Sequence, residues 1–198
     1  MKKAKLSSSA QDIVIRSVDL KRDGAVQEFF LARADEHKRF FVVFDLENPA
    51  PSALSIHLTG RGAGAAVFVL YTGRGASCNA LRVTLSHEAP NTYGRVIFRA
   101  ALYDASRVDF AGMLYIAKGA DGSDSYLSAK ALMLSDSAIA RIDPKLEILA
   151  NSVKASHGAT VGRLSEQDLF YFQSRGVDRK AAERVLVEAF LCEAANRP

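Results

Sequence analysis

Histidine and cysteine are the side chains best suited to bind iron or zinc, and the chain holds only four histidines and two cysteines. His157 stands in the segment ASHGATVG, between a strand-like run and a glycine-containing turn. A neutral imidazole can bind iron, and histidine replaces cysteine as an iron ligand in some two-iron clusters. The same residue could instead be structural, bonded to a turn carbonyl. His157 is therefore the leading candidate for a metal ligand, with the structural role left open.

The remaining histidines and the two cysteines favour simpler roles. His87 and Glu88 precede the turn-forming segment APNT, and we expect them to fix that turn. His57 alternates with apolar neighbours, so it should point away from their face. Cys78 and Cys192 form neither a CxxC pair nor a zinc spacing, which favours a reducing compartment. Either thiol could be an inert surface group.

Several function classes are disfavoured by the sequence. The glycine-rich pieces TGRGAGA and TGRGAS lack the GxxxxGK[ST] pattern of a phosphate-binding loop, so any ATP chemistry belongs to a partner. No Ser/His/Asp triad or carboxylate pair has a spacing that argues catalysis, and we expect no enzyme. A net charge of +4 is too weak to predict nucleic-acid binding. No apolar run approaches the ~20 residues of a membrane helix. We expect a cytoplasmic protein with a flexible tail over residues 1–12.

The body of the chain is typical of β-structure. Leu54, Ile56 and Leu58 alternate with more polar residues, which is the period of a half-buried strand. Similar runs recur every ~12 to 15 residues, separated by turns rich in Gly, Pro, Asp and Asn. No helical pattern interrupts residues 40–157, which excludes βαβ folds and leaves a sandwich, a barrel or a β-solenoid. Periodicity by itself puts the sandwich ahead of the solenoid.

Two short helices are predicted after Gly162. Ser165 is a suitable N-cap for the first helix, with Asp168 three residues later. Gly176 is placed to end that helix, because glycine readily adopts positive φ. Asp178 is the predicted cap of a second helix running to about Ala194.

The second helix carries apolar residues on more than one side. We expect one stripe to pack on the β-structure, at the spacing of a helix face: Ala182, Val185, Leu186, Ala189 and Phe190. Val187 and Leu191 fall on the opposite side, flanked by Lys180 and Arg184. The pattern predicts that this second side is exposed and binds a partner.

At this point the residues resemble a known family. The segment ASHGATVGRLSEQDLFYFQSRGV, followed by AAERVLVEAF, is similar to the C-terminal signature of the SufB/SufD family of iron–sulfur cluster assembly scaffolds. The similarity extends over about residues 55–193. It implies a right-handed parallel β-helix, here over residues 13–162, followed by a helical segment over residues 163–198. The resemblance thus replaces the sandwich with a β-solenoid.

The resemblance also implies partners. Family members dimerise through the β-helix, either as like pairs or as a SufB-type subunit with a SufD-type subunit. Their terminal helices dock a SufC-type ABC ATPase. The residues expected to bind that partner lie on the two helices: Phe170, Tyr171, Lys180, Arg184, Val187 and Leu191. An alternative is a structural module that dimerises and anchors the ATPase without binding a cluster. A carbohydrate-binding β-helix is the weakest alternative, because the chain has no tryptophan.

Departures from the family pattern bear on the cluster chemistry. SufB-type sequences have a cysteine where this chain has Ala129 and a glutamate where it has Gly158. SufD-type sequences often have a cysteine where this chain has Ala155. The chain therefore resembles SufD more closely but lacks both cysteines, and we expect it to lack the family's N-terminal helical region. We expect no firmly bound cofactor; the cofactor that the resemblance implies is a transient iron–sulfur cluster, with His157 as a ligand.

Overall fold

The computed structural model describes residues 11–16, 26–43 and 51–193. Within these ranges the chain forms a series of strands followed by two helices. The strands are β1 (Gln11–Arg16), β2 (Gln27–Leu31), β3 (His37–Val43), β4 (Pro51–Leu58), β5 (Gly64–Gly73), β6 (Cys78–His87), β7 (Tyr93–Leu102), β8 (Arg107–Ile116), β9 (Asp124–Met133), β10 (Ile139–Ile148) and β11 (Lys154–Arg163). The helices are α1 (Glu166–Ser174) and α2 (Arg179–Cys192).

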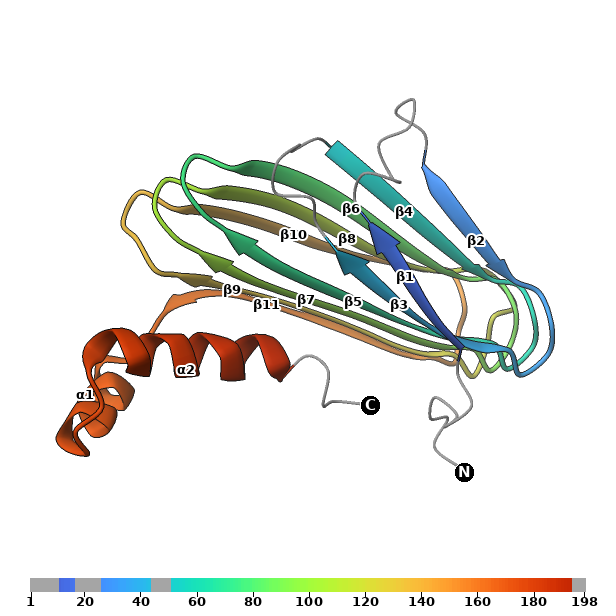
Figure 1. Cartoon of the computed structure of the whole chain (residues 1–198). Helices are drawn as coiled ribbons and strands as arrows, with labels where there is room; N and C mark the ends of the chain where they lie inside the picture. Colours follow the sequence, from blue (N-terminus) through green and yellow to red (C-terminus); the bar gives the residue numbers. More distant parts are fainter. Residues whose placement is uncertain (1–10, 17–25, 44–50, 194–198) are drawn as a thin grey trace.

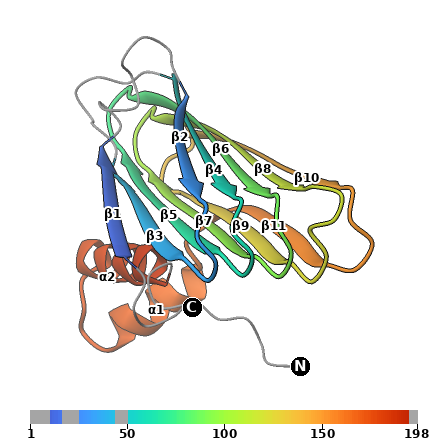
Figure 2. The same ribbon diagram turned by 90° about the vertical axis from the view of Figure 1, so that its right-hand side faces the viewer.

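The strands wind into a parallel β-helix. The odd-numbered strands form sheet A in the order β1-β3-β5-β7-β9-β11, and the even-numbered strands form sheet B in the order β10-β8-β6-β4-β2. Each strand from β1 to β9 therefore pairs in parallel with the strand two further along the chain. Figures 1 and 2 show the two sheets face to face, with the chain passing from one to the other at each turn. The fold expected from the family resemblance is confirmed, and the sandwich is not formed.

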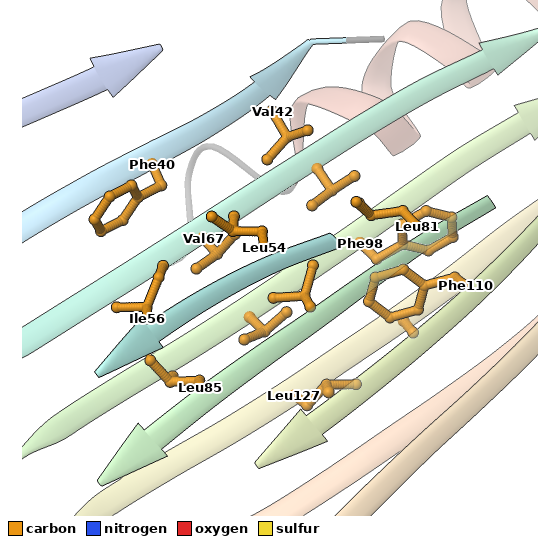
Figure 3. Close-up of a cluster of buried hydrophobic side chains, with 14 of the residues drawn as sticks. Phe40, Val42, Leu54, Ile56, Val67, Leu81, Leu85, Phe98, Phe110 and Leu127 are labelled. Carbon is orange, nitrogen blue, oxygen red and sulfur yellow. The ribbon is translucent and has the colours of Figure 1, made fainter. Parts of the chain in front are cut away.

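The core lies between the two sheets. In most strands the side chains that point inward are largely apolar, as in β8, where the inward residues are buried and the outward ones are half-buried. Phe98 of sheet A stacks on Phe110 of sheet B with 4.2 Å between ring centroids. Figure 3 shows these rings among the aliphatic side chains of both sheets. Each fully buried side chain of this size contributes about 1.5–3 kcal/mol, so the paired sheets supply the stability.

The N-terminal boundary of the β-helix differs from the expected one. Gln11 and Asp12, which we assigned to the tail, belong to β1 and pair with β3. The Asp12 carboxylate also accepts a hydrogen bond from Arg39, with 2.6 Å between Oδ1 and Nε. Residues 1–10 lie outside the described residues.

Both helices begin where the sequence predicts and α1 ends before Gly176, whereas α2 ends at Cys192 and the expected end, Ala194, lies outside the described residues. The Ser165 hydroxyl accepts from the amide of Asp168, and the Asp178 carboxylate accepts from the amides of Lys180 and Ala181. Gly176 has φ of 85° and ends the first helix. Neither helix is long and apolar enough to cross a membrane, as far as the described residues go.

The predicted orientation of α2 is wrong. Val187, which we expected on the exposed side, is only 5% exposed and packs with Ala101 and Leu132 of sheet A. Val185, expected in the core stripe, is exposed. The buried arc runs from Ala182 through Phe190 to Leu191, so the helix is turned by about one residue position, or ~100°. Apolar residues on both sides of α2 are compatible with either orientation. The observed orientation is the one that packs Val187 on the outward-facing residues Ala101 and Leu132 of sheet A.

Candidate functional site at the open end of the β-helix

The β-helix ends in two free strand edges. Strand β11 is the last strand of sheet A and β10 is the last strand of sheet B, so in the described part of the chain no strand pairs with their outer edges. Each edge presents unpaired backbone N–H and C=O groups, which can pair with a strand of another chain. The exposed apolar residues at this end include Ile139, Ile148, Leu149 and Val161. The end is therefore suited to protein–protein contact.

His157 lies on the inward face of β11. It is in register with Leu127 of β9, whose side chain is fully buried in the core. The imidazole is nevertheless exposed, because β11 is the last strand of sheet A among the described residues and no further turn of that part covers it. No hydrogen bond joins the imidazole to any residue that the structure describes, so a bond to a turn carbonyl is not seen. An exposed imidazole at the open end is accessible to a metal or to a partner chain.

The two positions at which the resemblance led us to expect cysteines are on the same inward face. Ala129 of β9 is in register with Ala159, two residues beyond His157, and Ala155 precedes His157 by two residues. Gly158 points outward, where an added Cβ would lie 3.3 Å from the Tyr126 hydroxyl oxygen. Methyl groups therefore flank the imidazole in place of thiols. The described residues contain no group of three His, Cys, Asp or Glu side chains that could hold a metal ion.

His87 is part of a buried polar network at the turn between β6 and β7. Its Nδ1 lies 2.7 Å from Thr92 Oγ1 and its Nε2 lies 2.9 Å from Ser125 Oγ. Thr92 also bonds to Ser123, whose hydroxyl donates to the carbonyl of Ala120. The prediction that His87 fixes this turn is confirmed. Its bond to Ser125 of β9 could not be predicted, because Ser125 lies far along the chain.

His57 points outward from sheet B, as the alternation predicts. It stacks on Phe30 with 4.6 Å between ring centroids, and its Nδ1 lies 2.6 Å from Glu88 Oε1. Glu88, which we expected to fix the turn together with His87, instead joins its side chain to His57 on the neighbouring strand β4. Cys78 and Cys192 are both free and exposed, at the start of β6 and at the end of α2.

The two helices offer an exposed surface next to sheet A. Phe170 is 72% exposed and Tyr171 is 58% exposed, which is unusual for aromatic side chains. Lys180 and Arg184 are also exposed, whereas Leu191 is partly buried against the cluster that contains Val187. Of the six residues expected to bind a partner, the four exposed ones remain available for that role. Figure 1 shows α1 and α2 lying outside the β-helix, on the side of sheet A.

Residues 49–190 match the family model described as "SUF system FeS cluster assembly, SufBD core domain". The chain belongs to this SufBD family. It is 33% identical over 112 residues to the iron–sulfur cluster assembly protein SufD of Escherichia coli, an alignment that covers 57% of this chain and 26% of the relative. It is 27% identical over 135 residues to an iron–sulfur cluster assembly SufBD family protein of Staphylococcus saprophyticus, covering 68% of this chain and 29% of the relative.

The matched part of the chain corresponds to between a quarter and a third of the length of these SufBD relatives. The family match covers most of the β-helix together with α1 and most of α2. It therefore includes both free edges, His157 and the exposed aromatic residues of α1. These are the features of this chain from which a function within the SUF system can be argued.

Proposed function

We propose that this protein is a SufD-like scaffold subunit in iron–sulfur cluster assembly, which holds partners together and catalyses no reaction itself. The observation that carries this proposal is the open end of the β-helix, where His157 stands exposed on the inward face of a free edge strand. A scaffold needs surfaces that other chains can bind. The free strand edges and exposed apolar residues at this end suit that role. The exposed free thiols Cys78 and Cys192 favour a reducing compartment, the cytoplasm.

Dimerisation through the open end follows from its composition. The inward residues Ile142 and Leu146 of β10 pack against the core, but their side chains are only half-buried. A second subunit placed against them would complete the burial that a further turn of the β-helix would otherwise provide. Such a contact would also satisfy the backbone groups of both edges. The partner is either a second copy or a SufB-type subunit.

The exposed surface of α1 and α2 is the proposed docking site for a SufC-type ABC ATPase. Aromatic and arginine side chains are enriched where interfaces have their strongest contacts. Phe170 and Tyr171 supply the aromatic part of this surface and Arg184 supplies a charge. Because Val187 is buried, it supports the helix instead of contacting the partner.

The ATPase proposal can be tested by measuring binding between this protein and the SUF-system ATPase of the same organism. We expect the Phe170→Ala/Tyr171→Ala variant to bind at least about tenfold more weakly, which corresponds to ~1.4 kcal/mol. Val161→Ala is a matched control, since this residue is also apolar and exposed but lies on β11. Equal binding by the aromatic variant and the wild type would place the docking surface elsewhere.

A second proposal is a structural module that dimerises and anchors the ATPase without holding a cluster. The observation that favours it is the pair of methyl groups at Ala129 and Ala155, on the inward face that bears His157. One imidazole cannot hold a cluster against exchange, so cluster binding then requires ligands from another subunit. Iron analysis of the purified assembly, with and without a SufB-type subunit, separates the two proposals.

A further inference from the structure

A groove lies on the outer face of sheet B, the sheet that Figure 1 shows on the side opposite the helices. Its cavity volume is about 530 Å³, and strands β4, β6, β8 and β10 all contribute to its lining. The floor consists of Ala53, Ala80 and Ala111, which are half-buried and point away from the core. A cavity of this size with an apolar floor is typical of a binding site.

Longer, charged side chains surround the alanine floor. In the register of the sheet, Arg82 lies between Ala53 and Ala111. Arg141 and Asp143 stand on β10, at the far side of the groove, and both are exposed. A molecule in the groove would therefore rest on methyl groups and meet charged groups beside them.

The two carboxylates of the groove already have cationic partners. Arg107 donates to both oxygens of Asp109, with 3.1 Å between Nε and Oδ2 and 3.3 Å between a terminal nitrogen and Oδ1. Asp143 lies 2.9 Å from Nζ of Lys145. Neither carboxylate needs a ligand to neutralise its charge.

The two guanidinium groups that line the groove are not neutralised in this way. Arg82 is exposed and makes no hydrogen bond or ion pair with any residue that the structure describes. The Arg141 side chain is 69% exposed, and its contact with Asp109 is long, at 3.9 Å. With Arg107 and Lys145 included, four cationic side chains face two carboxylates, so the local charge is +2. The groove therefore favours an anionic ligand.

We propose that this groove binds an extended acidic peptide segment of a partner protein, with an apolar side chain on the alanine floor and carboxylates paired with Arg82 and Arg141. Guanidinium and carboxylate form charge-assisted and often bidentate hydrogen bonds. An exposed ion pair by itself contributes little, so the apolar contact with the floor is needed as well. The groove is separate from the open end and from the helices, and the inference does not rest on the scaffold role proposed above.

The positions of the two arginines determine the spacing of the carboxylates in that peptide. Arg82 is in register with Ala111 and hence with Asp143, which is two residues beyond Arg141. With ~4.8 Å between strands and ~3.3 Å per residue, the Cα atoms of the two arginines are ~12 Å apart. In an extended chain, residues i, i+2 and i+4 share one face, and the outer two are ~13 Å apart. The expected motif is acidic–x–apolar–x–acidic.

A continuous polyanion fits the groove less well than a peptide. Asp109 and Asp143 line the groove beside the two arginines, and they would repel the closely spaced phosphates of a nucleic acid. A peptide can instead place neutral residues next to these carboxylates and restrict its own charges to the guanidinium groups. The mixed charge of the rim thus favours separate carboxylates over a row of phosphates.

The probe for this proposal is the synthetic peptide Glu-Ser-Leu-Ser-Glu, acetylated and amidated at its ends. Titration into the ¹⁵N-labelled full chain, followed by NMR, should give saturable shifts of the amides of Ala53, Ala80 and Ala111. The control peptide Leu-Ser-Ser-Glu-Glu has the same composition with adjacent carboxylates. We expect it to bind at least about tenfold more weakly, because it cannot reach both guanidinium groups.

Variants of the groove test the same contacts from the protein side. Arg82→Glu and Arg141→Glu should each weaken peptide binding by at least about tenfold, since each replaces an attraction with a repulsion. Arg163→Glu is the matched control, an exposed arginine of sheet A. Ala111→Trp should abolish binding by filling the groove, whereas Tyr115→Trp, on the same face of β8 but outside the lining, should not. Circular dichroism verifies that each variant folds.

Three outcomes would overturn the proposal. The first is peptide shifts that map to another surface, or no saturable shift up to ~10 mM peptide, well above a millimolar Kd. The second is equal binding of the two peptides, which would remove the predicted spacing. The third is a short single-stranded oligonucleotide that binds more tightly than the peptide and loses affinity in the same arginine variants, which would make the groove a polyanion site.

Discussion

Nε2 of His87 lies 2.9 Å from Ser125 Oγ, and this bond joins the end of β6 in sheet B to the start of β9 in sheet A. Both side chains are buried. One assignment of protons has Ser125 donating to Nε2 and Nδ1–H donating to Thr92, whose single proton is shared between Ser123 and the carbonyl of Ala89. The imidazole is neutral in this arrangement, and a proton on Nε2 would require the Ser125 hydroxyl to turn and accept instead of donate.

The stability of the fold should therefore depend on pH through His87. Burial, with the nearby Arg95 adding to it, lowers the pKa of His87 from 6.5 to about 4. Between these values the unfolded chain binds the proton and the folded chain does not, so stability is full above pH ~6.5 and is lost as pH falls toward ~4. The loss should reach about 3 kcal/mol, at 1.36 kcal/mol per pKa unit. Urea unfolding at several pH values measures it.

The variant His87→Gln is the control for this pH dependence. It removes the titrating group and should be less stable than the wild type at pH 7, by about 1–3 kcal/mol, because buried hydroxyls lose a partner. Its stability should change less than that of the wild type between pH 6.5 and 4. An identical pH dependence in both proteins would show that other groups are responsible.

Gly94 provides the space that His87 occupies. A Cβ at position 94 would lie 2.6 Å from Nε2 of His87 and 2.6 Å from Cδ2 of Leu85. We expect Gly94→Ala to destabilise the protein by about 1–3 kcal/mol, the usual effect of overpacking a core. Gly162→Ala is the matched substitution on β11, where an added Cβ meets nothing within 4 Å. That variant should be neutral or slightly more stable, because alanine restricts the unfolded chain.

The orientation of α2 can be verified with two valines of the same helix. Val187→Asp should cost about 3 kcal/mol or more, because it places a charge in the cluster with Ala101 and Leu132. Val185→Asp should change stability by less than about 0.5 kcal/mol, since this side chain is exposed. Thermal or urea unfolding compares them. The opposite order would restore the orientation that the sequence pattern suggested.

Cluster binding by the isolated chain should be weak. His157 is the ligand candidate at the open end, and the inward positions beside it carry the methyl groups of Ala129 and Ala155. After anaerobic incubation with iron and sulfide the protein should remain nearly colourless. The variant Ala155→Cys should retain more iron, because it adds a thiolate on the same side of β11. A stable chromophore in the wild type that His157→Ala abolishes would contradict this expectation.

The sequence by itself determined the elements of this protein and much of their chemistry. Alternating residues such as Leu54, Ile56 and Leu58 established the strands, and Ser165, Gly176 and Asp178 established the limits of the helices. These features depend on side-chain periodicity, capping and positive φ. Because these effects are local, they can be recognised from the sequence. The resemblance to SufB and SufD supplied the β-helix, which alternation could not distinguish from a sandwich.

The tertiary structure decided which faces meet and which edges stay free. Val187 is buried because Ala101 and Leu132 on the outward face of sheet A pack against that side of α2. The helical period of apolar residues was compatible with burial of either side. His87 bonds to the nearby Thr92 and to Ser125 of β9, and no local pattern joins it to Ser125, which lies far along the chain. His157 is exposed and the outer edge of β10 is free because both lie in the last turn of the β-helix that the structure describes. Each earlier strand pairs with the strand two further along the chain, which covers its edge.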